Sequence, residues 1–378
     1  MSVLVFSLAL SFLVYNTECS REGKLVLIEN PGEAVCLDGS PPGYYFRKGF
    51  GSGVNSWVVH LQGGAWCYNK KDCLARSRSY LGSSRDWPQI MIFNNAGMFS
   101  DSKEKNPDFY NWNMAQVQYC DGASFAGYVE KPVKVHGTDI YFRGFKILQA
   151  IIQSLMSKGM KNAQEFILTG CSAGGLATYL HADYIRSLFP PSVKYRAISD
   201  AGYFIDAPNK HGFKYMRYLF KNVFYLQNCS GGVDQDCIAA YESTHETWKC
   251  FMAQYTYRYI SSPIFTLNSM NDIWQLKNIL GIKCLPPKCT ESDMKHFYNF
   301  VENFNKASEP IFSLAKDGAF LDSCLIHCQA LISIPWRNFF VKGQSASTTF
   351  SNWYFNRDGS KSVKDCKYPC NKSCKSIV

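Results

Sequence analysis

Gly170-Cys171-Ser172-Ala173-Gly174 stands between two segments of different character. The residues before it, 165–169, are apolar and strand-like, and residues 173–187 carry apolar side chains at helical spacing. A G-x-S-x-G motif in this position is typical of a nucleophile elbow. The serine of an elbow adopts a strained backbone conformation, and the flanking glycines leave room for the sharp turn. The stretch therefore predicts that Ser172 is a nucleophile and that the amide of Ala173 faces an oxyanion.

Strands and helices alternate along the chain around this motif. Strands are predicted at 56–61, 114–119, 165–169, 194–199 and 262–267, and a helix at 143–158. Such alternation implies right-handed crossovers and a mostly parallel sheet, so we predict an α/β fold of the α/β-hydrolase type. Residues 207–258 lack strand alternation and are expected to form an insertion over the sheet. Since no repeat or flexible linker is evident, residues 20–378 are expected to form one domain.

A glycine-rich loop, Gln62-Gly63-Gly64-Ala65-Trp66, follows the first of these strands. Esterases with a serine elbow often place oxyanion donors on such a loop, which makes the amides of Ala65 and Trp66 candidates. An ordinary tight turn is the alternative. Asp121 and Ser124 follow the strand at 114–119 and are candidate substrate contacts, although turn chemistry explains them about as well. Parallel strands bring their carboxyl ends to one edge, so these residues should converge on Ser172.

A serine hydroxyl is a poor nucleophile and needs a base within hydrogen-bond reach. In this fold the chain order is nucleophile, acid, base. His327 is the last of the seven histidines and lies between two cysteines whose disulfides could fix its loop, so it is the predicted base. Asp272 follows the strand at 262–267 and is the predicted acid, with Asp200 as the alternative.

The chain carries a formal charge of +10, and its positive charges are scattered. This balance fits either a solvated basic surface or attraction to a polyanion. Nucleic acid is one such polyanion, but no module that binds it is recognisable. An acidic polysaccharide is another. The 46% content of hydrophobic residues excludes a disordered chain.

Residues 1–15 are apolar and uncharged, which predicts a signal peptide over residues 1–19 and secretion; an uncleaved anchor is the alternative. No later run is long enough to span a membrane. Sixteen cysteines in a secreted chain indicate disulfides. Zinc binding is the alternative, with Cys366, Cys370 and Cys374, spaced by four residues, as the candidate ligands. Cleavage after Cys19 leaves an odd number, and Cys171 is the predicted free thiol. Asn228 and Asn371 lie in glycosylation sequons.

Several of these stretches together resemble the plant pectin acetylesterases, a carbohydrate-esterase family that also contains the Notum carboxylesterases. The matching stretches are 61–67, 106–112, 119–125, 170–175, 199–204, 272–275 and 323–329. The resemblance implies Ser172 as nucleophile, Asp272 as acid and His327 as base, with oxyanion donors at Ala65, Trp66 and Ala173. Two positions depart from the family pattern: Ala65 replaces a usual glycine, and Asn271 replaces a usual aromatic residue before the acid.

The resemblance further implies a secreted serine esterase of the cell wall that removes O-acetyl groups from pectin through an acetyl-enzyme. It requires no metal or cofactor, and we expect a monomer. Two other functions stay open on the same fold. One is a Notum-like deacylase of a lipidated protein, which needs a deep apolar pocket. The other is an inactive carbohydrate-binding protein.

Overall fold

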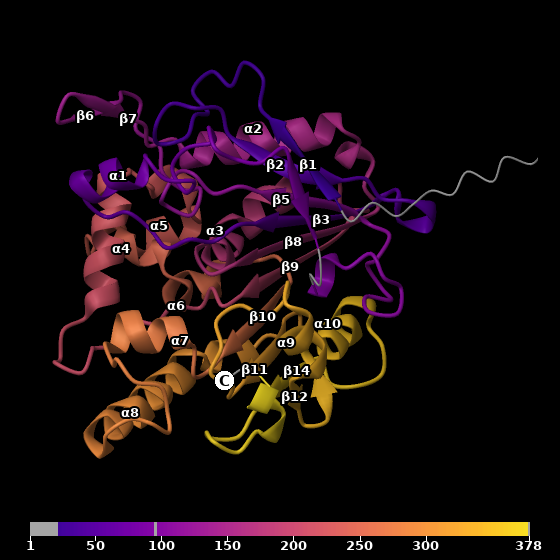
Figure 1. The fold of residues 1–378 in the computed structure, drawn as a ribbon, viewed down its shortest axis with the longest axis vertical. Helices are drawn as coiled ribbons and strands as arrows, with labels where there is room; N and C mark the ends of the chain where they lie inside the picture. Colours follow the sequence, from indigo (N-terminus) through magenta and orange to yellow (C-terminus); the bar gives the residue numbers. More distant parts are fainter. Residues whose placement is uncertain (1–21, 94–96, 377–378) are drawn as a thin grey trace, which may run out of the picture.

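The structure is a computed structural model that describes residues 22–93 and 97–376. At its centre is a ten-stranded sheet with helices on both sides (Figure 1). In spatial order its strands are β14 (Ser362–Lys364), β11 (Gly318–Asp322), β10 (Ile264–Ser269), β9 (Lys194–Asp200), β8 (Glu165–Cys171), β3 (Ser56–Leu61), β5 (Asn113–Val117), β2 (Gly43–Arg47), β1 (Glu22–Leu27) and β4 (Ile90–Ile92). The predicted signal peptide lies outside the described residues.

Every neighbouring pair from β14 to β5 is parallel, and the pairs from β5 to β4 are antiparallel. The predicted α/β fold with a mostly parallel sheet is therefore confirmed. Each of the five predicted strands is present within two residues of its expected bounds. The antiparallel extension by β2, β1 and β4 was not predicted.

The two faces of the sheet bury different side chains because successive residues of a strand point to opposite sides. Val59 and Leu168 face one core, and Val58 and Ile167 face the other. The first core is covered by α2 (Gly144–Ser157) and α3 (Ala173–Ser187), and the second by α9 (Ser333–Asn338) and α10 (Ala346–Phe355). Both faces of the central strands are thus buried, in keeping with their mostly apolar sequences.

The remaining helices lie around the carboxyl edge of the sheet. The insertion at 207–258 is free of strands, as predicted, and holds α4 (Tyr215–Leu226), α5 (Gln235–Glu242) and α6 (Ala253–Thr256). Figure 1 places α4 beside α1 (Lys70–Arg76). After β10 come α7 (Ile273–Gln275) and α8 (Glu291–Ala307), and two small hairpins pair β6 (Val133–Val135) with β7 (Thr138–Ile140) and β12 (Phe340–Val341) with β13 (Gln344–Ser345). Among the described residues no helix combines the length and apolarity needed to span a bilayer.

Seven disulfides join the described cysteines. The pairs are Cys36–Cys120, Cys67–Cys73, Cys171–Cys328, Cys237–Cys250, Cys284–Cys289, Cys324–Cys374 and Cys366–Cys370. The prediction that Cys171 is the free thiol is wrong, because the loop after β11 brings Cys328 against it. The free cysteine of the described residues is Cys229, which is buried. The three cysteines considered as zinc ligands are all bonded in disulfides.

The elbow packs closely against the end of β3. A Cβ atom on Gly174 would lie only 1.9 Å from the main-chain oxygen of Leu61, and one on Gly170 would lie 2.1 Å from the oxygen of Gly174. Neither neighbour is a movable side chain. The glycines of the motif are therefore required by the approach of two backbones as well as by the turn.

Replacing Gly174 with Ala should destabilise the protein by about 1–3 kcal/mol, because the added methyl group overlaps the backbone of β3. Chemical denaturation measures the change in the free energy of unfolding. Gly231→Ala is the matched control, since a Cβ there meets no atom within 4 Å. Equal stability of the two variants would contradict the close packing.

Candidate active site

Ser172 occupies the turn between β8 and α3 in a strained conformation. Its backbone angles are φ 60° and ψ −121°, a region that residues with a side chain rarely adopt. Its amide donates to the main-chain oxygen of Asp200 at 2.9 Å, which fixes the turn against the end of β9. The strain predicted for the elbow is present, and it lifts the serine out of the sheet at the N-terminus of α3.

Asp272 and His327 come from different loops and form a close pair. Asp272 caps α7, where its Oδ1 accepts a hydrogen bond from the amide of Gln275 at 3.0 Å. Its Oδ2 lies 2.7 Å from Nδ1 of His327. Asp272 is buried, so the carboxylate has one orientation and holds the imidazole with Nε2 pointing away. That Nε2 atom is buried and has no hydrogen-bond partner among the described residues.

Two interactions bring the loop of His327 to the loop of Ser172. The Cys171–Cys328 disulfide joins the residue before the serine to the residue after the histidine, with their Cα atoms 5.7 Å apart. The carboxylate of Asp200, the alternative acid, accepts hydrogen bonds from the amides of Gln329 and Ala330, both at 2.7 Å. Asp200 thus binds the backbone after His327 instead of its ring, and Asp272 is the carboxylate on Nδ1.

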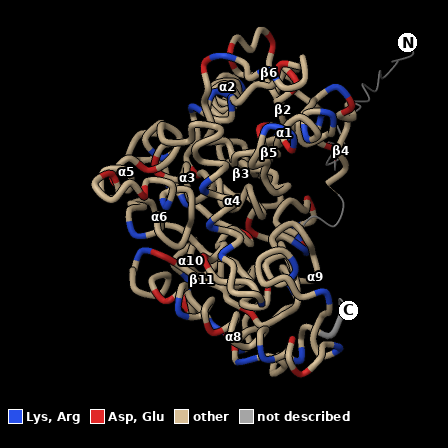
Figure 2. Tube along the Cα trace, turned by 90° about the vertical axis from the view of Figure 1, so that its left-hand side faces the viewer, with Lys and Arg blue, Asp and Glu red and all other residues tan. Residues whose placement is uncertain are grey.

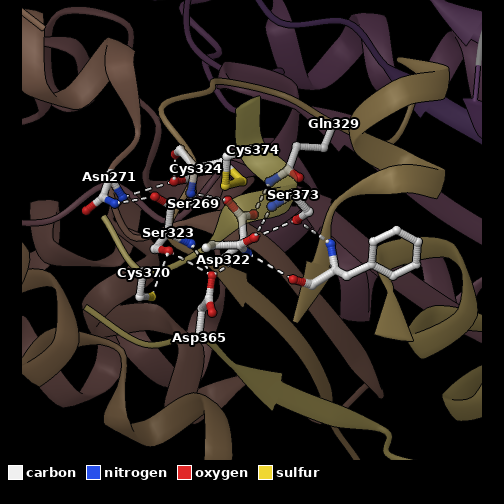
Figure 3. The surroundings of a disulfide bond; sticks show 12 residues. Ser269, Asn271, Asp322, Ser323, Cys324, Gln329, Asp365, Cys370, Ser373 and Cys374 are labelled. Atoms are coloured by element: carbon white, nitrogen blue, oxygen red, sulfur yellow. Dashed lines mark hydrogen bonds between the residues drawn. A yellow bond between two sulfur atoms is a disulfide. The ribbon is translucent and has the colours of Figure 1, made fainter. Parts of the chain in front are cut away.

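Hydrogen bonds around the Cys324–Cys374 disulfide also hold the loop of His327 in place (Figure 3). The buried carboxylate of Asp322 accepts hydrogen bonds from the amide of Cys324 at 2.8 Å and from the side chain of Gln329 at 2.6 Å. Asn271, the departure from the family pattern, is buried and donates to the main-chain oxygen of Ser323 at 2.6 Å. This asparagine therefore ties the loop of the acid to the loop of the base.

Two carboxylates set the protonation of His327. Burial alone lowers the pKa of the imidazole, but the charge and hydrogen bond of Asp272 and the charge of Asp200 outweigh that effect. The pKa of His327 is consequently raised above its ordinary value of 6.5. Burial raises the pKa of Asp200 to about 6, so this carboxyl is mostly ionised at neutral pH.

The glycine-rich loop lies directly against Ser172. A Cβ atom on Gly63 would lie 2.8 Å from Cβ of Ser172. Ala65 has φ 55°, so the position where the family usually has glycine does require a left-handed backbone here. None of the hydrogen bonds within the described residues uses the amides of Ala65, Trp66 or Ala173. These amides lie on the two segments next to Ser172 and are free to meet a developing negative charge.

Ser124 and Tyr119 support this loop from the interior. The indole of Trp66 donates to Oγ of Ser124, which donates to the main-chain oxygen of Ala173, both at 2.7 Å. The hydroxyl of Tyr119 donates to the main-chain oxygen of Ala65 at 2.9 Å. Ser124 therefore connects two segments that carry the candidate oxyanion donors. Tyr119 was not singled out from the sequence, since nothing in its spacing distinguishes it from a core residue.

Asp121 and Ser124 are fully buried. Asp121 accepts hydrogen bonds from the amides of Ala123 and Phe125 at 2.9 and 3.0 Å, as a turn residue does. Burial also raises the pKa of its carboxyl to about 6. Their predicted contact with substrate stays a prediction, whereas the contact of Ser124 with Trp66 of the glycine-rich loop is a feature of the structure.

Aromatic rings occupy the space beside His327. Trp274 stacks on the imidazole with ring centroids 6.1 Å apart, and Phe204 lies 6.4 Å away. Phe204 and Phe220 both contact Trp66 edge-on, at 5.0 and 4.7 Å. The sequence marked Trp66 only for its amide, yet its ring is the centre of this cluster.

Ala65→Gly should stabilise the protein by about 0.4–1 kcal/mol, because glycine adopts the left-handed backbone of this position without the steric penalty that alanine has. Glycine also increases the conformational entropy of the unfolded chain, which offsets only part of this gain. Denaturant titration tests this. Ala75→Gly, at an exposed position inside α1, should instead destabilise by about 0.5–1 kcal/mol. Equal destabilisation of both variants would contradict the strain at Ala65.

Comparison with known proteins places this geometry in a family. Residues 17–375 match the Pectinacetylesterase family. Pectin acetylesterase 5 of Arabidopsis thaliana is 38% identical over 93% of this chain and 84% of its own length. Pectin acetylesterase 7 of the same plant is 37% identical over 91% of this chain and 90% of its own length.

More distant relatives share the fold. The human palmitoleoyl-protein carboxylesterase NOTUM is 26% identical over 91% of this chain and 71% of its own length. The solved structure of the Wnt deacylase Notum from Drosophila superposes with a TM-score of 0.81 at 23% identity, covering 93% of this chain and 99% of that one. The chain belongs to the pectinacetylesterase family and has a Notum-like α/β fold with a mostly parallel sheet.

Proposed function

We propose that this carboxylic ester hydrolase releases acetate from acetylated pectin, with Ser172 as nucleophile, His327 as base and Asp272 as acid. The observation that carries the proposal is the arrangement around His327. Its Nδ1 is held by a buried carboxylate, its Nε2 has no hydrogen-bond partner in the described part of the chain, and a disulfide links its loop to the loop of the serine. Names of the Arabidopsis relatives support pectin as the substrate.

The reaction would proceed through an acetyl-enzyme. Oγ of Ser172 attacks the acetyl carbonyl while its proton passes to Nε2 of His327, and Asp272 stabilises the imidazolium. The amides of Ala65, Trp66 and Ala173 face the tetrahedral oxyanion. Its collapse expels the sugar oxygen, which takes the proton from His327. Water then loses a proton to His327 and attacks the acetyl group, releasing acetic acid and restoring the hydroxyl of Ser172.

A short acyl group fits the surroundings of His327 better than a long one. The ring of Trp66 contacts those of Phe204, Phe220 and Trp274 at centroid distances of 4.7–5.8 Å, and Phe204 contacts Trp274 at 5.3 Å. Such packing leaves each ring held by its neighbours. This favours acetyl over the palmitoleoyl group in the names of the NOTUM relatives, which stays the alternative.

We also propose that the protein is secreted to the cell wall after cleavage behind residue 19, and that residues 20–378 act there as one monomeric domain. Seven disulfides support an oxidising compartment.

Ser172→Ala should reduce acetate release from acetylated pectin roughly a thousandfold or more, because no other group replaces the nucleophile. Released acetate is measured enzymatically. A fluorophosphonate probe should label the wild type and spare the variant. Unchanged acetate release by Ser172→Ala would remove Ser172 from the mechanism, and an unlabelled, inactive wild type would favour a carbohydrate-binding protein.

The rate should fall on the acid side with the protonation of His327. Since its pKa is raised, the imidazole becomes charged and inactive as pH falls through a value above 6.5. Asp272 and Asp200 are the charged groups that act on the ring, so Asp200→Asn should move the midpoint of kcat/KM to lower pH. The pH profile of p-nitrophenyl acetate hydrolysis measures both. A midpoint that moves upward in Asp200→Asn would contradict this account.

p-Nitrophenyl acetate should be preferred over p-nitrophenyl octanoate by about tenfold or more in kcat/KM, because the aromatic rings leave little room for a longer chain. Phe220→Leu opens space without contacting His327 and should narrow that preference. A wild type that prefers octanoate would instead favour the long-chain deacylase.

A further inference from the structure

The segment that carries α4 has an unusual charge distribution. Residues 207–233 contain four lysines and arginines and neither aspartate nor glutamate. Arg217 is paired with Asp206, the residue directly before this segment, and Lys210 with Asp293 on α8. Lys214, whose Nζ lies 4.0 Å from the same carboxylate of Asp206, and Lys221 are exposed and share one face of the helix. Figure 2 looks onto the side of the molecule where α4 and α1 lie.

Three aromatic side chains form a continuous row on the same surface. The ring of Tyr218, exposed on α4, lies 6.0 Å from the ring of Tyr68 and 5.9 Å from that of Phe213. Tyr218 is 47% exposed and Phe213 52%. Tyr68 is half-buried. We call these three residues the aromatic row. Exposed aromatic side chains in mutual contact, rimmed by charges, are a feature of interaction surfaces.

The aromatic row begins beside the candidate active site. Tyr68 follows Trp66 by two residues, and the glycine-rich loop before Trp66 lies against Ser172. From the other side of α4, the buried Phe220 packs on Trp66. The helix therefore has one face in the aromatic cluster next to His327 and the opposite face in solvent. A polymer lying on the outer face would pass the oxyanion loop.

We propose that the aromatic row, together with Lys214 and Lys221, binds the backbone of an acidic polysaccharide next to the catalytic site. Aromatic faces provide a flat apolar surface for sugar rings, and the two lysines attract their carboxylates. The assignment rests on the proposed function for the position of the reactive ester, although binding itself needs no catalysis.

A second copy of the chain fits this surface less well. Two-fold symmetry would place the same patch on both partners, so Lys214 and Lys221 would face lysines of equal charge. Like charges brought together oppose association. On the α1 side, Asp72 in the first turn of that helix accepts a hydrogen bond from the amide of Tyr68, so it belongs to the local turn. Charge complementarity thus selects a polyanion.

The direct test measures binding of polygalacturonate, free of acetyl and methyl esters, to the full chain carrying Ser172→Ala. Adding Phe213→Ala and Tyr218→Ala should raise the Kd about tenfold, a loss of about 1.4 kcal/mol of binding free energy, because two of the three rings that would stack on the sugars are removed. Lys214→Gln with Lys221→Gln should weaken binding and flatten its salt dependence. Phe340→Ala is the matched control, since Phe340 is 45% exposed on β12 and lies outside the row. It should bind as the parent does.

A second measurement follows catalysis in the wild-type background. For Phe213→Ala with Tyr218→Ala, the ratio of kcat/KM on acetylated polymer to kcat/KM on p-nitrophenyl acetate should fall about tenfold, mainly through KM. Loss of both activities together would indicate a folding defect and contradict a binding role. Full activity of Ser172→Ala would overturn the proposed catalytic serine but would leave the binding result intact.

Three results would overturn the proposal itself. The row variant could bind polygalacturonate as tightly as the parent. A neutral galactan could bind as tightly as polygalacturonate, which would exclude recognition of charge. Light scattering could reveal a dimer that the row variant abolishes, which would assign the surface to a second copy of the chain.

Discussion

Asp200 is the residue on which the arrangement of this site depends. Its main-chain oxygen accepts the hydrogen bond of Ser172, and its buried carboxylate accepts the amides of Gln329 and Ala330. One residue at the end of β9 thus binds the turn of Ser172 and the loop of His327. A buried carboxylate without such partners is strongly unfavourable, so the fold requires these contacts for its own stability. The same hydrogen bonds thus stabilise the fold and position the candidate site.

The sequence predicted those elements of the fold whose pattern of apolar residues lies within one short segment. Strand β3 and helix α3 agree with the expected bounds, because apolar runs of that length and periodicity have few other structures. Strands β4 and β14 have three residues each and no alternation to detect, and β1, next to the edge strand β4, carries charged residues. Their formation depends on neighbours far along the chain, which a local pattern does not contain.

Some features of the candidate site could likewise be predicted from the sequence, and others could not. Ser172, Asp272 and His327 could be selected because chain order and strand ends restrict the choice, and the structure places the last two in contact. The partner of Cys171 could not be selected, since Cys328 is 157 residues away and no local feature links them. The positive φ of Ala65 and of Cys328 was equally hidden, because both are ordinary residues in a conformation that tertiary contacts impose.

The Cys171–Cys328 disulfide closes residues 171–328 into a covalent ring, and Ser172, Asp272, His327 and the whole of α4 belong to it. A protease that cut one exposed loop within this ring would divide the chain into two peptides. The disulfide next to Ser172 would still join them. Because the serine and the histidine flank the joining bond, neither could diffuse away from the other. Tolerance of a nicked backbone is thus a property that the position of this one bond confers on the enzyme.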